Sequence, residues 1–259
     1  MAKKKSEKIA KSRRRRVYKN PPIHEAVCEF QFSNPENWTL AHSGQFLERV
    51  KKRYAGKPSE QRILRVNMPK GDMPRAAPPS LDEITKVQLR SENGRELVAV
   101  GPGILSIHSL KPYAGWEHFR SQIVEALREY CRIALPKAVL RIGIRYINQI
   151  FVPQQKGVPN DFFTTPPCGI PEVECVIETF AMRYEYSLEN SSKAVVQLAR
   201  LAGPPDTYGV ALDIDVSRSW QGESYNATSA LEAVDALRHQ ERQIFEAMIT
   251  DKARELFDA

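Results

Sequence analysis

Apolar residues in the first half of the chain recur at two different spacings. Residues 26–32 alternate one cysteine and two phenylalanines with other side chains, which predicts a strand with one buried face. Apolar side chains at helical spacing predict helices over residues 39–54 and 115–134. Between these helices the pattern predicts strands at 63–66, 84–90 and 96–108, a proline-rich loop at 68–80, a hairpin turn at Asn93-Gly94, and a break of the last strand at Gly101-Pro102-Gly103.

The second half has a similar pattern. Residues 138–152 predict a long strand, and the five prolines between Pro153 and Pro171 predict an irregular connector with one short helix near residues 161–164. The sequence Ser229-x-x-Glu232 predicts a capping box that opens a C-terminal helix, whose apolar stripe extends to Leu256. Three further strands are predicted between these segments, at residues 173–188, 193–201 and 209–217.

This order of elements predicts an α+β fold. A strand, a helix, three strands and a second helix follow one another in residues 26–134 and again in residues 138–257, which indicates a duplicated β-α-β-β-β-α unit. Hairpins with segregated helices favour a mainly antiparallel sheet with two long helices packed on it. The expected organisation is a basic tail at residues 1–19 and two α+β halves, 20–136 and 137–259, that form one compact globule.

Charge separates the N-terminal tail from the rest of the chain. Residues 1–19 hold ten lysines and arginines and one glutamate, a net of +9, so the remaining residues carry −2 of the total +7. A segment so highly charged is expected to be disordered when free, and to contact polyanions or only to aid solubility. The candidate polyanion-binding residues of the tail are Lys3, Lys4, Lys5, Arg13, Arg14, Arg15 and Arg16.

Motifs for cofactors and catalysis are missing from the sequence. The four cysteines form no Cys-x-x-Cys pair, the five histidines have no metal-ligand spacing, and there is no Gly-x-Ser-x-Gly elbow or nucleotide-binding glycine loop. We therefore expect no cofactor and assign no catalytic residue. No apolar run reaches the roughly 18 residues of a membrane span, and no export signal precedes the fold, so we expect a cytoplasmic protein.

Two pairs of charged residues each lie on one face of a predicted strand. Arg141 and Arg145 are four residues apart, so their guanidinium groups could clamp a phosphate or a carboxylate, or form ion pairs with neighbouring acids such as Glu29 or Glu178. Ion pairs are the preferred interpretation, because they are the usual company of charges in sheets.

The second pair is Asp213 and Asp215, which are candidates for holding a divalent metal. A metal-dependent nuclease needs a third acid and a nearby lysine or histidine, and no such string follows them. An exposed acidic face paired with basic side chains is the preferred interpretation.

Several strings in the sequence together resemble a known family. They are Tyr18-Lys19-Asn20-Pro21-Pro22-Ile23, Pro112-Tyr113-x-Gly115-Trp116-Glu117-x-Phe119, Arg141-Ile142-Gly143-Ile144-Arg145-Tyr146-Ile147-Asn148, Asp213-Ile214-Asp215, and His239 with Phe245-Glu246 and Ile249-Thr250-Asp251. The chain resembles a sporadically distributed bacterial protein family of about 260 residues with no assigned activity. The resemblance covers residues 18–257 and implies membership of mobile-element, toxin–antitoxin or phage-defence modules.

Three functions are therefore carried forward from the sequence. The first is a soluble binding or interaction protein with a protein partner, acting as a non-catalytic component of such a module. The second is a nucleic-acid-binding protein whose tail supplies phosphate contacts, helped by Arg141 and Arg145. The third is a metal-dependent nuclease that uses Asp213 and Asp215.

Overall fold

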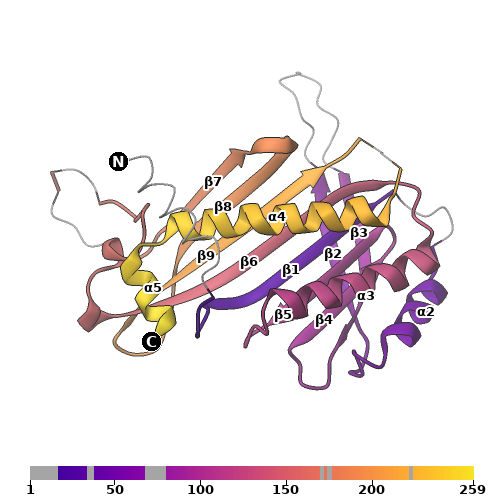
Figure 1. The fold of residues 1–259 in the computed structure, drawn as a ribbon, viewed down its shortest axis with the longest axis horizontal. Helices are drawn as coiled ribbons and strands as arrows, with labels where there is room; N and C mark the ends of the chain where they lie inside the picture. The colour runs from indigo at the N-terminus through magenta and orange to yellow at the C-terminus, as the bar shows by residue number, and fades with distance from the viewer. Residues whose placement is uncertain (1–16, 34–37, 68–79, 170–171, 174–176, 222–223) are drawn as a thin grey trace.

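A computed structural model describes residues 17–33, 38–67, 80–169, 172–173, 177–221 and 224–259. The described part is α+β, as predicted, and contains one nine-stranded antiparallel sheet and four helices (Figure 1). None of the helices in these ranges is both long and apolar enough to cross a lipid bilayer. The predicted loop at residues 68–80 lies almost entirely outside the described residues, as does most of the basic tail.

The elements follow one another in this order along the chain. The first half contains β1 (Ile23–Phe32), α2 (Leu40–Val50), β2 (Ser59–Asn67), β3 (Ser80–Arg90), β4 (Glu96–Gly101), β5 (Ile104–Leu110) and α3 (Trp116–Ala134). The second half contains β6 (Val139–Pro153), β7 (Ala181–Ser187), β8 (Ser192–Leu201), β9 (Thr207–Ser219), α4 (Ala227–Met248) and α5 (Asp251–Asp258), with three 3₁₀ turns at Gln154–Lys156, Pro159–Asp161 and Glu189–Ser191.

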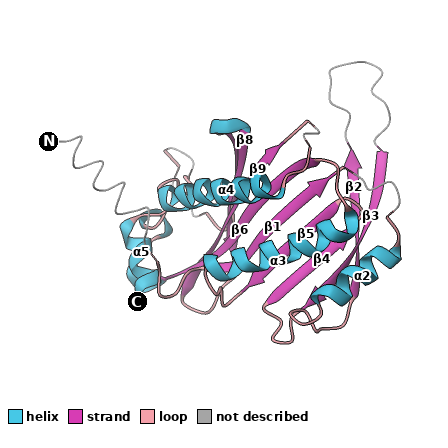
Figure 2. Ribbon diagram, turned by 45° about the vertical axis from the view of Figure 1, so that its right-hand side comes forward, coloured by secondary structure: helices cyan, strands magenta, loops and turns pink. Residues whose placement is uncertain are grey.

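The two halves meet at the centre of the sheet, where β1 pairs with β6. The strand order is β2-β3-β4-β5-β1-β6-β9-β8-β7, so each half contributes one side of a continuous sheet. Helix α4 packs on β6 and β9, α3 on β5, and α2 on β4 and α3, which places these helices on one face (Figures 1 and 2). We call this the helical face and the opposite one the open face.

Alternation along β6 shows why the sheet has two unlike faces. Ile142, Ile144 and Tyr146 are buried against the helices, whereas Arg141 and Arg145 point to the open face and keep part of their surface exposed. Successive side chains of a strand point to opposite faces, so this pattern buries the even-numbered positions of β6 from Ile142 to Val152. The helical face therefore carries the hydrophobic core, and the open face carries charged side chains.

A bulge near the start of β1 changes which face its side chains occupy. Ile23 pairs with Asn148 and Glu25 pairs with Ile147, so one extra residue, His24, is inserted into β1. Bulges of this kind re-aim side chains. Ile23 therefore points to the helical face, like its partner Asn148, although Glu25 and Val27 point to the open face beside Arg145.

Several sequence predictions need correction in the second half. No α-helix is present among residues 161–164; 3₁₀ turns occupy Gln154–Lys156 and Pro159–Asp161 instead. The strand predicted from residue 173 begins only at Ala181. In the first half the predicted break at Gly101-Pro102-Gly103 separates β4 from β5, so four strands lie between α2 and α3 where the repeat unit was expected to have three. Among the described residues the long helices α3 and α4 are accompanied by the shorter α2 and α5.

The C-terminal helix starts earlier than predicted and is interrupted. Its cap is Asn226, whose side chain accepts a 3.0 Å hydrogen bond from the Ser229 amide, so Ser229 lies inside the first turn and does not open a capping box. The helix ends at Met248 because the loop after β6 pairs with the chain there: Thr164 N donates to Met248 O and Thr250 N to Phe162 O. Thr250 then caps α5 as a separate helix.

Candidate functional site

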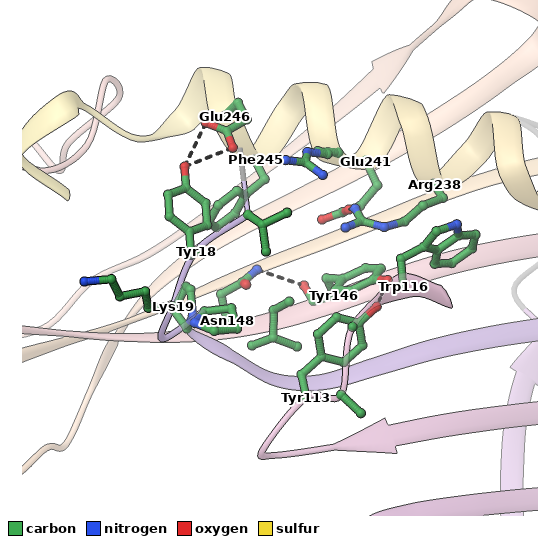
Figure 3. A pocket seen from close by; sticks show the side chains of 17 residues that line it. Tyr18, Lys19, Tyr113, Trp116, Tyr146, Asn148, Arg238, Glu241, Phe245 and Glu246 are labelled. Carbon is green, nitrogen blue, oxygen red and sulfur yellow. Dashed lines mark hydrogen bonds and ion pairs between the residues drawn. The ribbon is translucent and has the colours of Figure 1, made fainter. Parts of the chain in front are cut away.

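A cavity of about 320 Å³ lies between α4 and the centre of the sheet (Figure 3). Four separate segments build its walls: residues 17–23, residues 113–116, Tyr146 and Asn148 of β6, and one face of α4. Its size is that of a site for a small organic molecule, because ligand pockets commonly measure about 300–1,000 Å³.

Aromatic side chains form much of the wall. Tyr146 is buried on the helical face of β6, and its hydroxyl lies 2.9 Å from that of Tyr113, which precedes α3. Their rings meet edge to face with centroids 5.8 Å apart. Burial raises the pKa of Tyr113 to about 12 and that of Tyr146 well above its ordinary value, so both hydroxyls stay protonated at neutral pH.

Two charged residues of α4, Arg238 and Glu241, point from the helix into this aromatic setting (Figure 3). They are three residues apart, one helical turn, and Arg238 Nη1 donates to a carboxylate oxygen of Glu241. The Arg238 guanidinium lies 4.3 Å from the ring centroid of Tyr146 and 5.7 Å from that of Trp116. Cation–π attraction therefore helps to hold the arginine side chain in place.

Glu241 is the most unusual titratable group of the cavity. It is 2% exposed, and this burial raises the pKa of its carboxyl group to about 7, because the charged form loses its hydration. The positive charges of Arg238 and Arg242 oppose the shift but do not cancel it. Glu241 therefore changes protonation near neutral pH, in direct contact with a buried arginine.

The N-terminal wall of the cavity is tied to the C-terminal helices. Tyr18 donates a hydrogen bond to Glu246, and the backbone amide and side-chain amide of Asn20 donate to Phe257 O and Ala259 O, both at 2.8 Å. Pro22 O accepts from the Gln149 amide of β6. These contacts fix residues 18–22 across the gap between α4, α5 and the sheet.

Glu246 lines the same cavity, but its charge is already compensated. Arg254, 1% exposed, donates from Nε to its carboxylate at 3.0 Å and from Nη2 to its backbone carbonyl. Arg254 Nη1 also reaches Asp251 at 2.8 Å. With Tyr18 on the same carboxylate, Glu246 holds together the junction of the N-terminal segment, α4 and α5.

The chemistry of the walls favours binding. The described residues that line the cavity include no serine, threonine, cysteine, histidine or aspartate. The wall offers apolar surface, three tyrosine hydroxyls, the Asn148 amide and the Arg238–Glu241 pair. A few polar groups in a mainly apolar wall are typical of a site that orients one small molecule.

Arg141 and Arg145, predicted from the sequence, lie on the open face, away from this cavity. Arg141 Nη2 is 3.1 Å from Asp215, and its Nη1 is 3.8 Å from Glu29, so one of the two acids named as its potential partners is indeed a neighbour. Arg145 Nε donates to Asp213 at 2.8 Å. These contacts agree with the preferred interpretation, in which both arginines form ion pairs with neighbouring strands.

Asp213 and Asp215 are the carboxylate partners of those arginines. Burial raises the pKa of Asp215, and Arg141 and Arg145 oppose that shift. No group of three or more histidine, cysteine, aspartate or glutamate side chains that could hold a metal ion occurs among the described residues. The tail residues Lys3, Lys4, Lys5 and Arg13–Arg16 lie outside the described part of the chain.

Arg238 and Glu241 are absent from the candidates that the sequence suggests, although α4 carries a sign of them. The apolar stripe of α4 runs through Val234, Leu237, Phe245 and Met248, and Glu241 occupies the stripe position between Leu237 and Phe245. A carboxylate at a core position of an amphipathic helix is rare unless it is paired. The strings used for the family resemblance also contribute Tyr18, Tyr113, Trp116, Tyr146, Asn148, Phe245 and Glu246 to the cavity wall.

The geometry of the cavity is the basis for assigning a function, because similarity supplies none. Arg238 and Glu241 of α4, Tyr113 from the segment before α3, Tyr146 from the middle of β6 and the N-terminal segment all converge there. Comparisons with models of protein families, with curated proteins and with solved structures found no match.

Proposed function

We propose that this protein acts by binding a small organic molecule in the cavity between α4 and β6, without transforming it. The observation that carries the proposal is the cavity itself. It has a volume of about 320 Å³, its wall is aromatic over much of its area, and the Arg238–Glu241 pair lines it. Buried ionisable groups in a concave, mainly apolar site are a common mark of function.

The surroundings of the cavity support a fixed, preorganised site. Tyr18 and Asn20 bind the N-terminal wall to α4 and α5, and the Tyr113–Tyr146 hydroxyl contact joins the α3 side to the sheet. A site whose walls are held by hydrogen bonds loses less conformational entropy when it takes up a ligand. Preorganisation of this kind suits selective binding of one chemical class.

The wider biological role that we propose comes from the family resemblance. A binding protein of this type fits the expected non-catalytic component of a mobile-element, toxin–antitoxin or phage-defence module, with a protein partner and a cytoplasmic location, and each of these remains a prediction. In that setting the cavity would sense a small molecule and the surrounding surface would contact the partner.

The two halves of the sheet further support the proposed duplication. In the first half β1 pairs with β5, β5 with β4 and β4 with β3, followed by α3; in the second β6 pairs with β9, β9 with β8 and β8 with β7, followed by α4. We infer that the halves derive from one unit, and that the second has no counterpart of α2 and β2 among its described residues. The cavity then lies at the junction between the two copies.

A calorimetric experiment tests the binding proposal. The probes are three naphthalenes with the same rings and different charge: 2-naphthoate, 2-naphthylmethanol and 2-naphthylmethylammonium. We expect at least one probe to bind the wild-type chain, and Ile23→Trp, which fills the cavity, to weaken that binding at least tenfold. Val27→Trp is the matched control, because Val27 lies on the same strand but points to the open face.

Three outcomes would overturn the proposal. The first is the absence of heat for all three probes up to their solubility limits. The second is equal binding by the wild-type chain and by an Ile23→Trp variant whose circular dichroism and melting temperature show that it is folded. The third is loss of binding in both tryptophan variants, because it would place the probe elsewhere.

A further inference from the structure

We propose that the ligand of the cavity is an organic anion, a carboxylate or a phosphate ester on an apolar body, and that Arg238 binds its anionic group in exchange for Glu241. This inference rests on the proposed function and adds to it the chemical class of the ligand. It follows from the position of Arg238, from the balance of charge around the cavity and from the contact with Glu241.

Arg238 is placed to accept a second partner. Its side chain is 15% exposed, and this surface faces the cavity that the residue lines. A guanidinium carries five N–H donors, and the described residues provide a hydrogen-bond acceptor only to Nη1, namely Glu241. The remaining donors form a planar edge, which matches the two oxygens of a carboxylate or a phosphate.

The charge around the cavity favours an anion. Lys19, Arg238 and Arg242 line it, against two acids, Glu241 and Glu246. The negative charge of Glu246 is already compensated by Arg254. Even without Arg242, Lys19 and Arg238 against Glu241 leave an excess of positive charge at the described walls, which attracts anions and repels cations.

The aromatic rings of the cavity wall also favour an anionic ligand over a cationic one. An aromatic cage binds a cation through the faces of its rings, but here the guanidinium of Arg238 already lies over Tyr146 and close to Trp116. A cationic ligand would have to displace this arginine from both rings. An anionic ligand leaves it in place, and the rest of the aromatic wall is free to pack against the ligand's apolar body.

Glu241 is the partner of Arg238 that the anionic group of the ligand replaces. Arg238, Arg242 and Glu246 face it from α4, Tyr113 from the segment before α3 and Tyr146 from β6, and Lys19 lines the same cavity. Both tyrosines stay neutral because their pKa values are raised, so they do not titrate with it. An anion on Arg238 repels the Glu241 carboxylate and favours its protonated form. Binding therefore takes up a proton.

The experiment uses calorimetry on the full chain with 2-naphthoate, 2-naphthyl phosphate, 2-naphthylmethanol and 2-naphthylmethylammonium. We expect one of the two anions to bind at least tenfold more tightly than the alcohol, and the ammonium to bind most weakly. The comparison of naphthoate with naphthyl phosphate tells which anionic group the site takes. Arg238→Gln is expected to remove the advantage of the anion, and Arg120→Gln, on α3 at an exposed ion pair with Asp235, to keep it.

Proton uptake gives a second readout that needs no arginine variant. Titrations of the wild-type chain at pH 7.5 in triethanolamine and in Tris, two non-anionic buffers with different ionisation enthalpies, are expected to show uptake of a fraction of a proton. In Glu241→Gln this uptake is expected to vanish while the anion still binds. The affinity of the wild-type chain for the anion is expected to fall between pH 6.5 and pH 8.5, as the Glu241 carboxylate competes for Arg238.

The outcomes separate this inference from the proposed function. If the alcohol binds and Ile23→Trp abolishes its binding, but neither anion binds more tightly, the cavity is a binding site and the assignment of an anion is wrong. If the anion binds without proton uptake, the exchange with Glu241 is wrong. If no probe binds, both the proposed function and the inference fail.

Discussion

The hydroxyl of Tyr18 donates to the carboxylate of Glu246, 228 residues later in the chain, with 2.9 Å between the Tyr18 oxygen and Oε1. The Tyr18 ring also meets the rings of Phe245 and Phe257 edge to face, with centroids 6.4 and 5.3 Å apart. One side chain therefore fastens the N-terminal segment to both C-terminal helices. The same segment is a wall of the cavity, so its attachment affects stability and binding together.

Tyr18→Phe is expected to keep the ring contacts and to lose the hydrogen bond. A hydrogen bond to a charged group contributes about 1.5–3 kcal/mol, so we expect the free energy of unfolding to fall by roughly 1–2 kcal/mol, since Arg254 still compensates Glu246. Urea unfolding measures the difference. Tyr186→Phe, at an exposed tyrosine of β7, is the control and should change stability by less than about 0.5 kcal/mol. Equal stability of wild type and Tyr18→Phe would contradict this role.

The buried pair of Arg254 and Glu246 predicts a larger effect. Arg254→Met leaves the Glu246 carboxylate buried without its guanidinium, which typically costs about 3–5 kcal/mol. Combining Arg254→Met with Glu246→Gln removes the uncompensated charge, and we expect the double variant to be more stable than Arg254→Met alone. The control is Arg183→Met, at the exposed pair with Glu185, where a loss below about 1 kcal/mol is expected. Simple additivity of the two single changes would show that the pair is not coupled.

The pKa of Glu241 predicts how stability varies with pH. This pKa is about 7 in the folded chain and near 4.5 in an unfolded one. The protonated form is thus favoured in the fold: its contribution is fully present below pH 4.5 and is lost as the pH rises to about 7. A difference of this size corresponds to roughly 3 kcal/mol. Urea unfolding at pH 5 to 8 should show wild type losing stability relative to Glu241→Gln over this range.

The comparison isolates one group, because all other titrations are shared by the two chains. Glu232→Gln, at an exposed glutamate of the same helix, controls for the removal of a carboxylate from α4. It should keep the same pH dependence as wild type. A constant difference between wild type and Glu241→Gln from pH 5 to pH 8 would mean that Glu241 titrates as an ordinary exposed acid.

The sequence predicts the sheet well because one of its faces is buried. The alternation in β1 and β6 and the helical spacing in α3 and α4 are direct consequences of packing against a single core, and the predicted segments overlap the observed ones. The break after Met248 could not be predicted in this way. It depends on backbone hydrogen bonds to Phe162 and Thr164, which are more than 80 residues away in the sequence.

The cavity could not be predicted for a related reason. Its walls come from four segments, and Tyr113 and Tyr146 become part of a cavity only because α4 lies across them. Glu241 alone gave a local sign, as an acid within an apolar stripe. Arg141 and Arg145 were easier than Glu241 to recognise as candidates from the sequence. They nevertheless lie on the open face, where they form ion pairs with nearby carboxylates.

The ion pairs of the open face predict unequal effects for the two arginines. Arg141 lies between Asp215 and Glu29, so Arg141→Gln leaves two half-buried acids without this positive charge, and we expect a loss of roughly 1–2 kcal/mol. Arg145 is 45% exposed and contacts Asp213, so Arg145→Gln should cost less than about 1 kcal/mol. Urea unfolding of the two variants decides between them. A larger loss for Arg145→Gln would reverse this assignment.

The positive charge of residues 1–16 predicts where any contact with nucleic acid occurs. This segment holds nine basic residues and one acid, so removing it takes away a net charge of +8 and leaves the chain slightly negative. Each phosphate contact adds about −0.9 to the slope of log affinity against log salt. We therefore expect deletion of residues 1–16 to bring the slope for a duplex DNA close to zero, measured by fluorescence anisotropy between 50 and 200 mM salt. Arg141→Gln with Arg145→Gln should leave the slope unchanged, because both side chains are engaged by carboxylates. A truncated chain that keeps the full slope would place the nucleic-acid contact in the folded part.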